Sequence, residues 1–243
     1  PAPAPEPLWQ TALAVAFPVA VGAALLGWNL NAGSLFSSDD VLYTQMAREA
    51  VTSGDWLGQT WLGTPVFEKP PLLFWLLELS GSLWGWGEGA MRLPGLAASV
   101  VALIYLVRLS RAAVGPGASR GSRAWAGSLA VLFTVGTVGF TLNARRPMTD
   151  PLLTAAVLAT LWHALQVMGA PGRRGPATAL GVAAGLGLLA KSVAIGPAAL
   201  VAGLGVLAAR RFREAAWAVG VALLVAAPWH VAMTLTHGAT FWE

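Results

Sequence analysis

Long apolar blocks alternate with short polar clusters along the whole chain. Eight blocks rich in Leu, Ala, Val and Gly cover residues 8–30, 71–86, 93–109, 125–142, 151–168, 177–190, 193–209 and 215–235. A helix needs about 20 apolar residues to cross the hydrocarbon of a bilayer, and most of these blocks approach that length. Only a helix or a closed barrel satisfies its backbone hydrogen bonds in lipid. The pattern therefore predicts an all-α integral membrane protein.

Composition supports this prediction and excludes one alternative. Charged residues make up 11% of the chain and hydrophobic residues 56%, whereas a soluble domain carries about 25% charged residues. The formal net charge of +4 would suit a nucleic-acid partner, but the basic residues lie in loops between apolar blocks. That placement indicates membrane topology, so we expect no nucleic acid. The absence of cysteine excludes disulfides and thiolate metal sites.

The basic loops set the predicted topology. Three loops are rich in arginine, over residues 108–123, 173–174 and 210–213, and such loops face the cytoplasm. With a cytoplasmic N-terminus, the polar segments 31–70, 85–92 and 143–150 then face outside. The block 71–86 would begin and end outside, and it is short and contains Glu78, so we expect it to lie along the membrane or to dip into it. This gives about seven crossings and an outer C-terminus.

In this topology, basic residues lie mostly on the cytoplasmic side and acidic residues mostly on the outer side. Nine of the fifteen basic residues fall inside, while nine of the eleven acidic residues fall outside. The candidate chemical groups therefore gather on the outer face. No soluble domain interrupts the blocks, and we read residues 1–7, Pro-Ala-Pro-Ala-Pro-Glu-Pro, as a flexible lead-in.

The first outer segment should contain an amphipathic helix with two acids at its start. Ser38 can cap this helix, Asp39 and Asp40 suit the positive end of the helix dipole, and Gly54 can end it. The paired carboxylates could supply a general base or bind a metal, or they could only cap the helix. Both interpretations stay open on spacing alone.

A second polar cluster precedes the block 71–86. Glu68 and Lys69 stand directly before Pro70 and Pro71, at the depth of the lipid headgroups. An ammonium group there can hold a lipid phosphate. The simpler alternative is a lysine that reaches from an apolar surface toward water.

Several motifs in order resemble one enzyme family. The first outer segment resembles that of the lipid A aminoarabinose transferases and related protein O-mannosyltransferase-like enzymes of the GT-C superfamily. The resemblance extends from residue 8 to the C-terminus. It rests on Asp39-Asp40-x-x-Tyr43, Ala47-Arg48-Glu49, Ser53-Gly54-Asp55-Trp56, Phe67-Glu68-Lys69-Pro70-Pro71-Leu72, Met91-Arg92-Leu93-Pro94, Ala144-Arg145-Arg146-Pro147-Met148-Thr149-Asp150-Pro151, Gly187-Leu188-Leu189-Ala190-Lys191 and Pro228-Trp229-His230.

The resemblance implies a conserved seven-helix core with juxtamembrane helices in the first outer loop, and transfer of a sugar from a polyprenyl phosphate to an acceptor at the outer face. Asp39 matches the catalytic carboxylate, a general base toward the acceptor hydroxyl, and Lys69 would hold the departing phosphate. Glu68 matches a position tied to a divalent metal, the one cofactor that we expect. The remaining candidate substrate-binding residues are Tyr43, Arg145, Arg146, Asp150 and Lys191.

Two departures from the family keep alternatives open. Leu42 stands where the family carries a phosphate-binding arginine, and family members continue past the Pro-Trp motif into a further half that is absent here. One hypothesis is the N-terminal portion of an inner-membrane glycosyltransferase. The second is a degenerate, non-catalytic subunit of a larger membrane complex, and a transporter or channel is a third. We expect membrane lipids and other membrane subunits as partners, and we expect His230 and His237 to be hydrogen-bonded rather than metal ligands.

Overall fold

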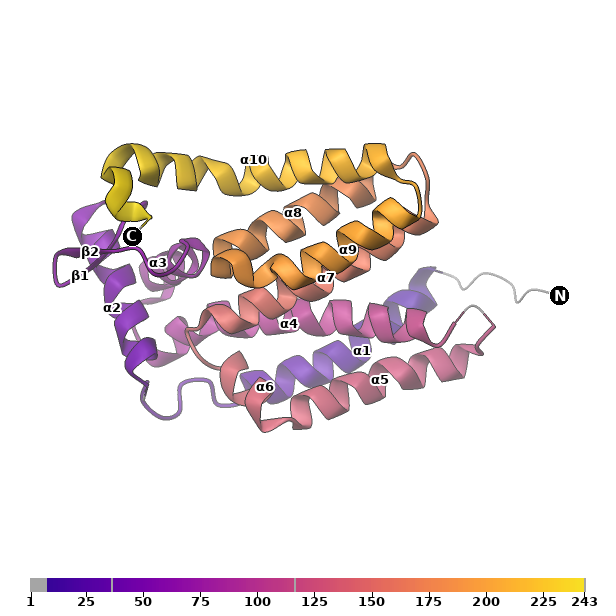
Figure 1. The fold of residues 1–243 in the computed structure, drawn as a ribbon. Helices are drawn as coiled ribbons and strands as arrows, with labels where there is room; N and C mark the ends of the chain where they lie inside the picture. The colour runs from indigo at the N-terminus through magenta and orange to yellow at the C-terminus, as the bar shows by residue number, and fades with distance from the viewer. Residues whose placement is uncertain (1–7, 36, 116, 243) are drawn as a thin grey trace.

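The computed structural model describes residues 8–35, 37–115 and 117–242, and helices dominate them. Within these residues, seven helices run along an elongated bundle (Figure 1). They are α1 (Leu8–Gly27), α4 (Glu88–Ala113), α5 (Arg120–Gly136), α7 (Thr149–Gly169), α8 (Arg174–Lys191), α9 (Gly196–Ala208) and α10 (Phe212–His237).

One end of the bundle is covered by shorter elements, which we call the cap. The cap consists of α2 (Ser38–Ser53), the strands β1 (Gln59–Trp61) and β2 (Thr64–Val66), α3 (Leu72–Trp84), α6 (Val138–Ala144) and the 3₁₀ turn η2 (Gly238–Phe241) (Figure 1). The loops between α4 and α5, between α7 and α8, and between α9 and α10 lie at the opposite end, which we call the arginine end. Acidic and basic segments therefore separate as predicted.

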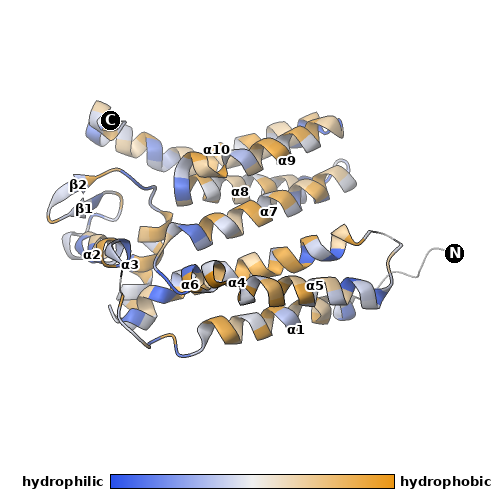
Figure 2. Cartoon of the chain, turned by 60° about the horizontal axis from the view of Figure 1, so that its bottom comes forward, coloured by the Kyte–Doolittle hydropathy of each residue, from blue (hydrophilic) through white to orange (hydrophobic). Residues whose placement is uncertain are grey.

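The bundle has the surface of a membrane protein. Four stretches are long and apolar enough to cross a bilayer, namely Glu88–Ala113, Thr149–Gly169, Arg174–Ala208 and Phe212–Phe241, and a fifth is added if the bent pair α5 and α6 counts as one span. Figure 2 shows hydrophobic residues along the lengths of these helices and hydrophilic residues mainly toward the two ends. The chain is an integral membrane protein.

The stretch Arg174–Ala208 reverses direction at the 3₁₀ turn η1 (Ser192–Ile195). Lys191, at the end of α8, contacts Asp150 at the start of α7. Arg211, just after α9, contacts Met168 at the end of α7. Since both helices flank α7, α8 and α9 run in opposite directions, as the two separate apolar blocks predicted. The total number of membrane crossings stays a prediction.

The block 125–142, which we expected to be one span, is divided at Thr137. This residue has an extended backbone (φ −80°, ψ 121°), and its hydroxyl donates to the Phe133 carbonyl at 2.9 Å. The chain turns by 79° there, and α6 lies at the cap (Figure 1). The hydropathy pattern could not show this turn, because apolar residues continue past Thr137 with Val138, Phe140 and Leu142.

The block 71–86 forms α3, which lies in the cap and packs against α2, α4 and α8. It does not run along the bundle, which agrees with the predicted juxtamembrane helix. The hairpin β1–β2 was not predicted, because its strands have three residues each. Its turn places Leu62 and Gly63 at φ 51° and 79°, the left-handed conformation that tight hairpin turns require.

Small residues bring the long helices close together. A Cβ atom at Gly181 of α8 would lie 2.4 Å from the Ala218 carbonyl of α10, and one at Gly185 would lie 2.7 Å from Val225. No side chain fits at either position, so α8 and α10 meet through their backbones, as membrane helices commonly do.

Candidate active site in the cap

Charged side chains from separate segments of the chain meet in the cap. Asp39, Asp40 and Tyr43 lie in the first turns of α2, and Glu68 and Lys69 lie in the segment that leads into α3. The other members follow α6, open α7 and end α8; they are Arg145, Arg146, Asp150 and Lys191. All the site residues proposed from the sequence therefore lie at the same end of the bundle.

The start of α2 differs by one residue from the sequence prediction. Ser37, not Ser38, caps the helix, and its Oγ accepts from the Asp40 backbone N–H at 3.3 Å. Gly54 ends the helix as predicted, in the left-handed conformation at φ 78°. Because the cap is Ser37, Asp39 and Asp40 occupy the first helical turn, where the helix dipole favours negative charge.

Asp40 is a structural residue. It is 1% exposed, and the Arg146 Nε donates to its two carboxylate oxygens at 2.9 and 3.2 Å. The same guanidinium also donates to the Ser37 Oγ. This buried ion pair joins the start of α2 to the segment before α7, more than 100 residues away in the sequence. Arg146 therefore holds Asp40 in place instead of presenting an open charge to a substrate.

Asp39 differs from Asp40 in both its burial and its pairing. It is partly exposed, and among the described residues its carboxylate has no hydrogen bond or ion pair. An accessible carboxylate at the helix start has lone pairs available for a proton. Of the two paired acids, Asp39 is thus the one that can act as a base.

The pKa of the Tyr43 hydroxyl shows which charged groups act on this residue. Burial, together with smaller contributions from the negative charges of Asp39, Glu68 and Asp150, raises the pKa of its hydroxyl to about 12. Such charges act on a pKa only at short range. Three carboxylates from three segments are therefore near enough to act on one buried phenol, which forms part of the core between α2 and α3.

Asp150 also binds a cation. The Lys191 Nζ donates to its Oδ1 at 2.9 Å, and the two side chains are 42% and 34% exposed. The pair therefore lies where a solute or lipid headgroup can reach it. In the segment before α3, Lys69 is partly exposed and Glu68 is exposed. The cap thus offers two accessible ammonium groups beside its carboxylates.

Two arginines organise the segment between α1 and α2. Arg145 donates to the Asn29 carbonyl at 2.8 Å. Arg92, which is 7% exposed, donates to four backbone carbonyls, those of Leu30, Ala32, Gly33 and Ser34, at 2.6 to 3.2 Å. This role of Arg92 was not predicted, because its partners are carbonyls of a loop about 60 residues away. Arg145 lies in the cap as predicted, with its guanidinium bound to the backbone.

The end of α10 completes the cap, which the sequence did not predict. The Trp229 Nε1 donates to the Leu57 carbonyl at 3.0 Å. Phe67, next to Glu68, packs on His237 and Phe241 with ring centroids 4.8 and 5.7 Å apart. These contacts fix the segment that carries Glu68 and Lys69. His230 is hydrogen-bonded to the Ala226 carbonyl at 2.9 Å, as expected.

The described carboxylates do not form a cluster that could hold a metal ion. In the part of the chain that the structure describes, no group of three or more His, Asp or Glu side chains could hold a metal ion. Glu68 thus has no set of partner ligands there. The divalent metal stays a prediction, and we derive no chemical step from it.

Comparison with known proteins agrees with this arrangement. Residues 68–232 match the family described as dolichyl-phosphate-mannose-protein mannosyltransferase. The chain is 29% identical over 223 residues to the undecaprenyl phosphate-alpha-4-amino-4-deoxy-L-arabinose arabinosyl transferase of Edwardsiella ictaluri, covering 86% of this chain and 38% of the relative. It is 31% identical over 209 residues to the enzyme of the same name from Aeromonas hydrophila, covering 83% and 37%.

The fold is also that of a solved structure. The crystal structure of ArnT from Cupriavidus metallidurans bound to undecaprenyl phosphate superposes with a TM-score of 0.74 at 24% identity, over 94% of this chain and 43% of that one. The chain thus spans about two-fifths of the length of the proteins it resembles. Since the family match covers more than half of the chain, the chain belongs to the dolichyl-phosphate-mannose-protein mannosyltransferase family, GT-C glycosyltransferases that include the aminoarabinose transferases.

Proposed function

We propose that this chain is part of a membrane glycosyltransferase that transfers a sugar from a polyprenyl-phosphate donor to an acceptor hydroxyl. One observation carries the proposal: the accessible carboxylate of Asp39 shares the cap with two accessible ammonium groups, Lys69 and Lys191. A transfer of this kind needs a base for the acceptor and cations for a departing phosphate. The relatives' names and the undecaprenyl phosphate bound by ArnT supply the donor class.

The proposed reaction is a single displacement. The acceptor oxygen attacks the anomeric carbon, and the bond from that carbon to the phosphate oxygen breaks. Asp39 takes the proton of the acceptor hydroxyl, while the electron pair of the broken bond stays on the polyprenyl phosphate. Lys69 and Lys191 neutralise the charge that develops there. Attack opposite the leaving group inverts the anomeric carbon.

Asp150 has a positioning role in this proposal. Its Oδ1 accepts from Lys191 at 2.9 Å, so it holds the ammonium group at the start of α7. Arg146 acts indirectly, since it fixes Asp40 and with it the first turn of α2. The base and the cations therefore come from α2, the segment before α3 and the end of α8, and their arrangement depends on the folded cap.

We further propose that the cap faces the outside of an inner membrane. The arginine end carries the three arginine-rich loops, and such loops stay in the cytoplasm. The donor's long apolar chain would then enter the outer leaflet beside the cap. A cysteine-labelling experiment with a membrane-impermeant reagent at exposed residue 55 of the cap tests this orientation. Labelling in intact cells supports it, and labelling only after lysis contradicts it.

The decisive test is the transfer reaction itself. The complete protein that contains this chain, reconstituted in liposomes with a radiolabelled polyprenyl-phosphate sugar, should lose transfer by roughly 10² to 10⁴-fold when Asp39 is changed to Asn. Glu88→Gln is the matched control, since Glu88 is an exposed acid in the first turn of α4. Equal transfer by wild type and Asp39→Asn would remove Asp39 from the reaction.

Leu42 favours a second candidate function, a non-catalytic subunit of a larger membrane complex. Leu42 packs against the core cluster of α2 and α3, so the position where the resembled motif carries a cation here stabilises the fold. Under this alternative the protein co-purifies in fixed stoichiometry with other subunits, and Asp39→Asn leaves both assembly and any sugar transfer in the extract unchanged.

A further inference from the structure

Glu49 connects α2 to the hairpin β1–β2, and the proposed sugar transfer has so far assigned it no role. It belongs to the Ala47-Arg48-Glu49 motif in the second half of α2. Its Oε1 accepts from the Leu62 backbone N–H at 3.1 Å. Its Oε2 accepts from the Thr60 hydroxyl at 2.9 Å and from the Gly63 N–H at 3.3 Å. One carboxylate therefore holds both strand β1 and the turn that follows it.

Gln45, one turn earlier in α2, aligns this carboxylate. Its Nε2 donates to the Glu49 Oε1 at 3.1 Å, so four donors in total point at the two oxygens. Burial raises the pKa of Glu49, but the hydrogen bonds from these four donors lower it, and the net shift is downward from 4.5. The carboxylate is therefore ionised at neutral pH, and hydrogen bonds to an ionised acceptor are stronger than those to a neutral one.

The turn needs this support because Leu62 has a left-handed backbone conformation. Its φ is 51°, which is unfavourable for a residue with a bulky side chain, and Gly63 follows at 79°. Two-residue hairpin turns of this kind favour Asn, Asp or Gly at the first position. Leu62 is 73% exposed, so packing of its side chain contributes little to the turn. The hydrogen bonds to Glu49 hold the strained residue in place instead.

The hairpin leads directly to Lys69. Strand β2 ends at Val66, which packs against the core cluster of α2 and α3, and only two residues separate Val66 from Lys69. The register of the hairpin pairs Val66 with Gln59, the neighbour of Thr60. A shift of the turn relative to α2 is therefore passed on through β2 to the segment that carries Lys69.

We propose that Glu49 is a positioning residue that fixes the place of Lys69 relative to Asp39. Asp39 lies in the first turn of α2, and Glu49, about 15 Å farther along the same helix, holds the hairpin that leads to Lys69. The helix α2 therefore sets the distance between the base and one cation of the sugar transfer. The inference rests on the proposed function and adds to it a residue that touches no reacting atom.

A double-mutant cycle tests the link to Lys69, with the complete protein in liposomes and a radiolabelled polyprenyl-phosphate sugar. Glu49→Ala should lower kcat/KM roughly 10 to 100-fold, because a displacement of about 1 Å can cost that much. In a Lys69→Gln background the same change should cost less than about twofold, because the ammonium group that Glu49 positions is already absent. Thr52→Ala is the matched control and should leave transfer unchanged, since the exposed Thr52 hydroxyl donates to the Arg48 carbonyl of its own helix.

The outcomes separate this inference from the proposed function. If Asp39→Asn abolishes transfer but Glu49→Ala costs the same factor in both backgrounds, the proposed function stands and Glu49 does not act through Lys69. A loss in Thr52→Ala as large as that in Glu49→Ala also overturns the inference. If Asp39→Asn leaves transfer unchanged, the proposed function fails and this inference fails with it.

Two further measurements address the turn itself. Hydrogen exchange of the backbone amides of residues 59–66 should be several-fold faster in Glu49→Ala than in wild type, because the turn loses its anchor. Unchanged exchange contradicts the anchoring. Leu62→Asn, added to Glu49→Ala, should restore part of the lost transfer, since Asn adopts the left-handed conformation more readily than Leu. Without such a recovery, Glu49 does not act through the turn.

Discussion

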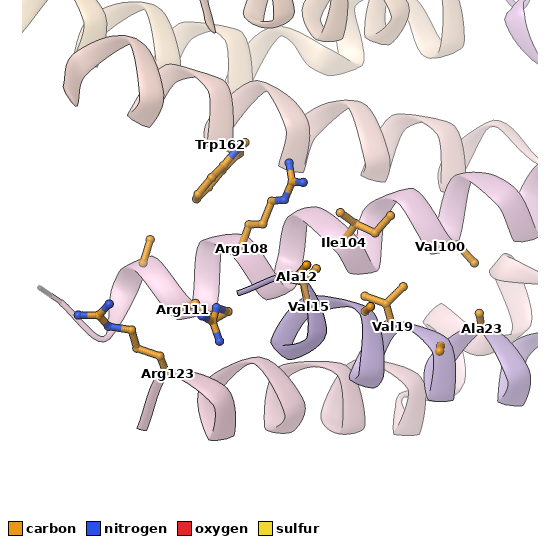
Figure 3. A pocket seen from close by; sticks show the side chains of 13 residues that line it. Ala12, Val15, Val19, Ala23, Val100, Ile104, Arg108, Arg111, Arg123 and Trp162 are labelled. Atoms are coloured by element: carbon orange, nitrogen blue, oxygen red, sulfur yellow. The ribbon is translucent and has the colours of Figure 1, made fainter. Parts of the chain in front are cut away.

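The cap and the arginine end hold their charges in different ways. In the cap, ion pairs and side-chain bonds connect residues far apart in the sequence, as between Arg146 and Asp40 or between Trp229 and Leu57. At the arginine end, the basic residues cluster in short loops and in the helix turns beside them, and three of them, in α4 and α5, line an apolar groove beside α1 (Figure 3). Local clustering of basic residues suffices to set membrane topology, whereas positioning a base and cations together requires long-range contacts.

Asp39 and Asp40, adjacent residues at the start of α2, also differ in how their charges are held. Asp40 is buried and its charge is satisfied by Arg146, while Asp39 beside it is partly exposed. The buried acid supports the cap, and the exposed acid is available for chemistry. Neighbouring residues of the same type therefore have opposite roles, because one side of α2 faces the segment before α7.

Breaking the Asp40–Arg146 pair should have the largest effect on the stability of the cap. Arg146→Met leaves the Asp40 carboxylate buried without its cation, and removal of one partner of a buried pair costs about 3–5 kcal/mol. Thermal unfolding in detergent measures this loss. Asp40→Leu combined with Arg146→Met should recover much of it, since no buried charge then remains unpaired.

Asp39→Asn is the matched control for that measurement. We expect it to change the free energy of unfolding by less than about 0.5 kcal/mol, as for a surface substitution. If Asp39→Asn destabilises the protein as much as Arg146→Met does, the two acids do not differ as described.

Glu78 extends the comparison of Asp39 with Asp40, because it is a cap acid that is buried like Asp40 but has no cation beside it among the described residues. It is fully buried in α3, and among the described residues neither carboxylate oxygen has a hydrogen bond. Burial, with a smaller contribution from the charge of Asp55, raises its pKa from 4.5 to about 8. The folded protein therefore binds one more proton than the unfolded chain between these two pH values, so stability falls as pH rises through this window.

Glu78→Gln should remove this dependence. We expect a flatter profile of unfolding temperature between pH 5 and pH 9, and a gain of about 1–3 kcal/mol over wild type at the alkaline end. Glu88→Gln, at an exposed position, should keep the wild-type profile. An unchanged profile in Glu78→Gln would show that Glu78 is ionised in the folded protein at neutral pH.

Lys191→Gln should have the smallest effect on stability. Its pair with Asp150 is partly exposed, and exposed ion pairs contribute about 0–1 kcal/mol. Because our proposal places Lys191 at the leaving phosphate, sugar transfer should nevertheless fall by roughly 10 to 100-fold. Arg48→Gln, at an exposed position on α2, should leave transfer unchanged. A large loss of stability in Lys191→Gln would assign this residue a structural role instead.

Much of the fold could be predicted from hydropathy and charge. The helical blocks, the juxtamembrane position of α3 and the shared end for Asp39 and Asp150 all follow from residue type and spacing. The turn at Thr137 and the hairpin β1–β2 did not, because each depends on a few backbone bonds that leave the hydropathy pattern unchanged.

The sequence by itself determined that the chain lies in a membrane, which end collects the acids, and which motifs resemble the family, since these properties depend on the order and chemistry of residues along the chain. Only the tertiary structure decided that Asp40 is buried against Arg146 while Asp39 stays accessible, that Arg92 and Arg145 hold backbone carbonyls, and that three arginines end an apolar groove. The physical reason is that partner and burial are set by helices packed from distant parts of the chain, and no local pattern specifies them.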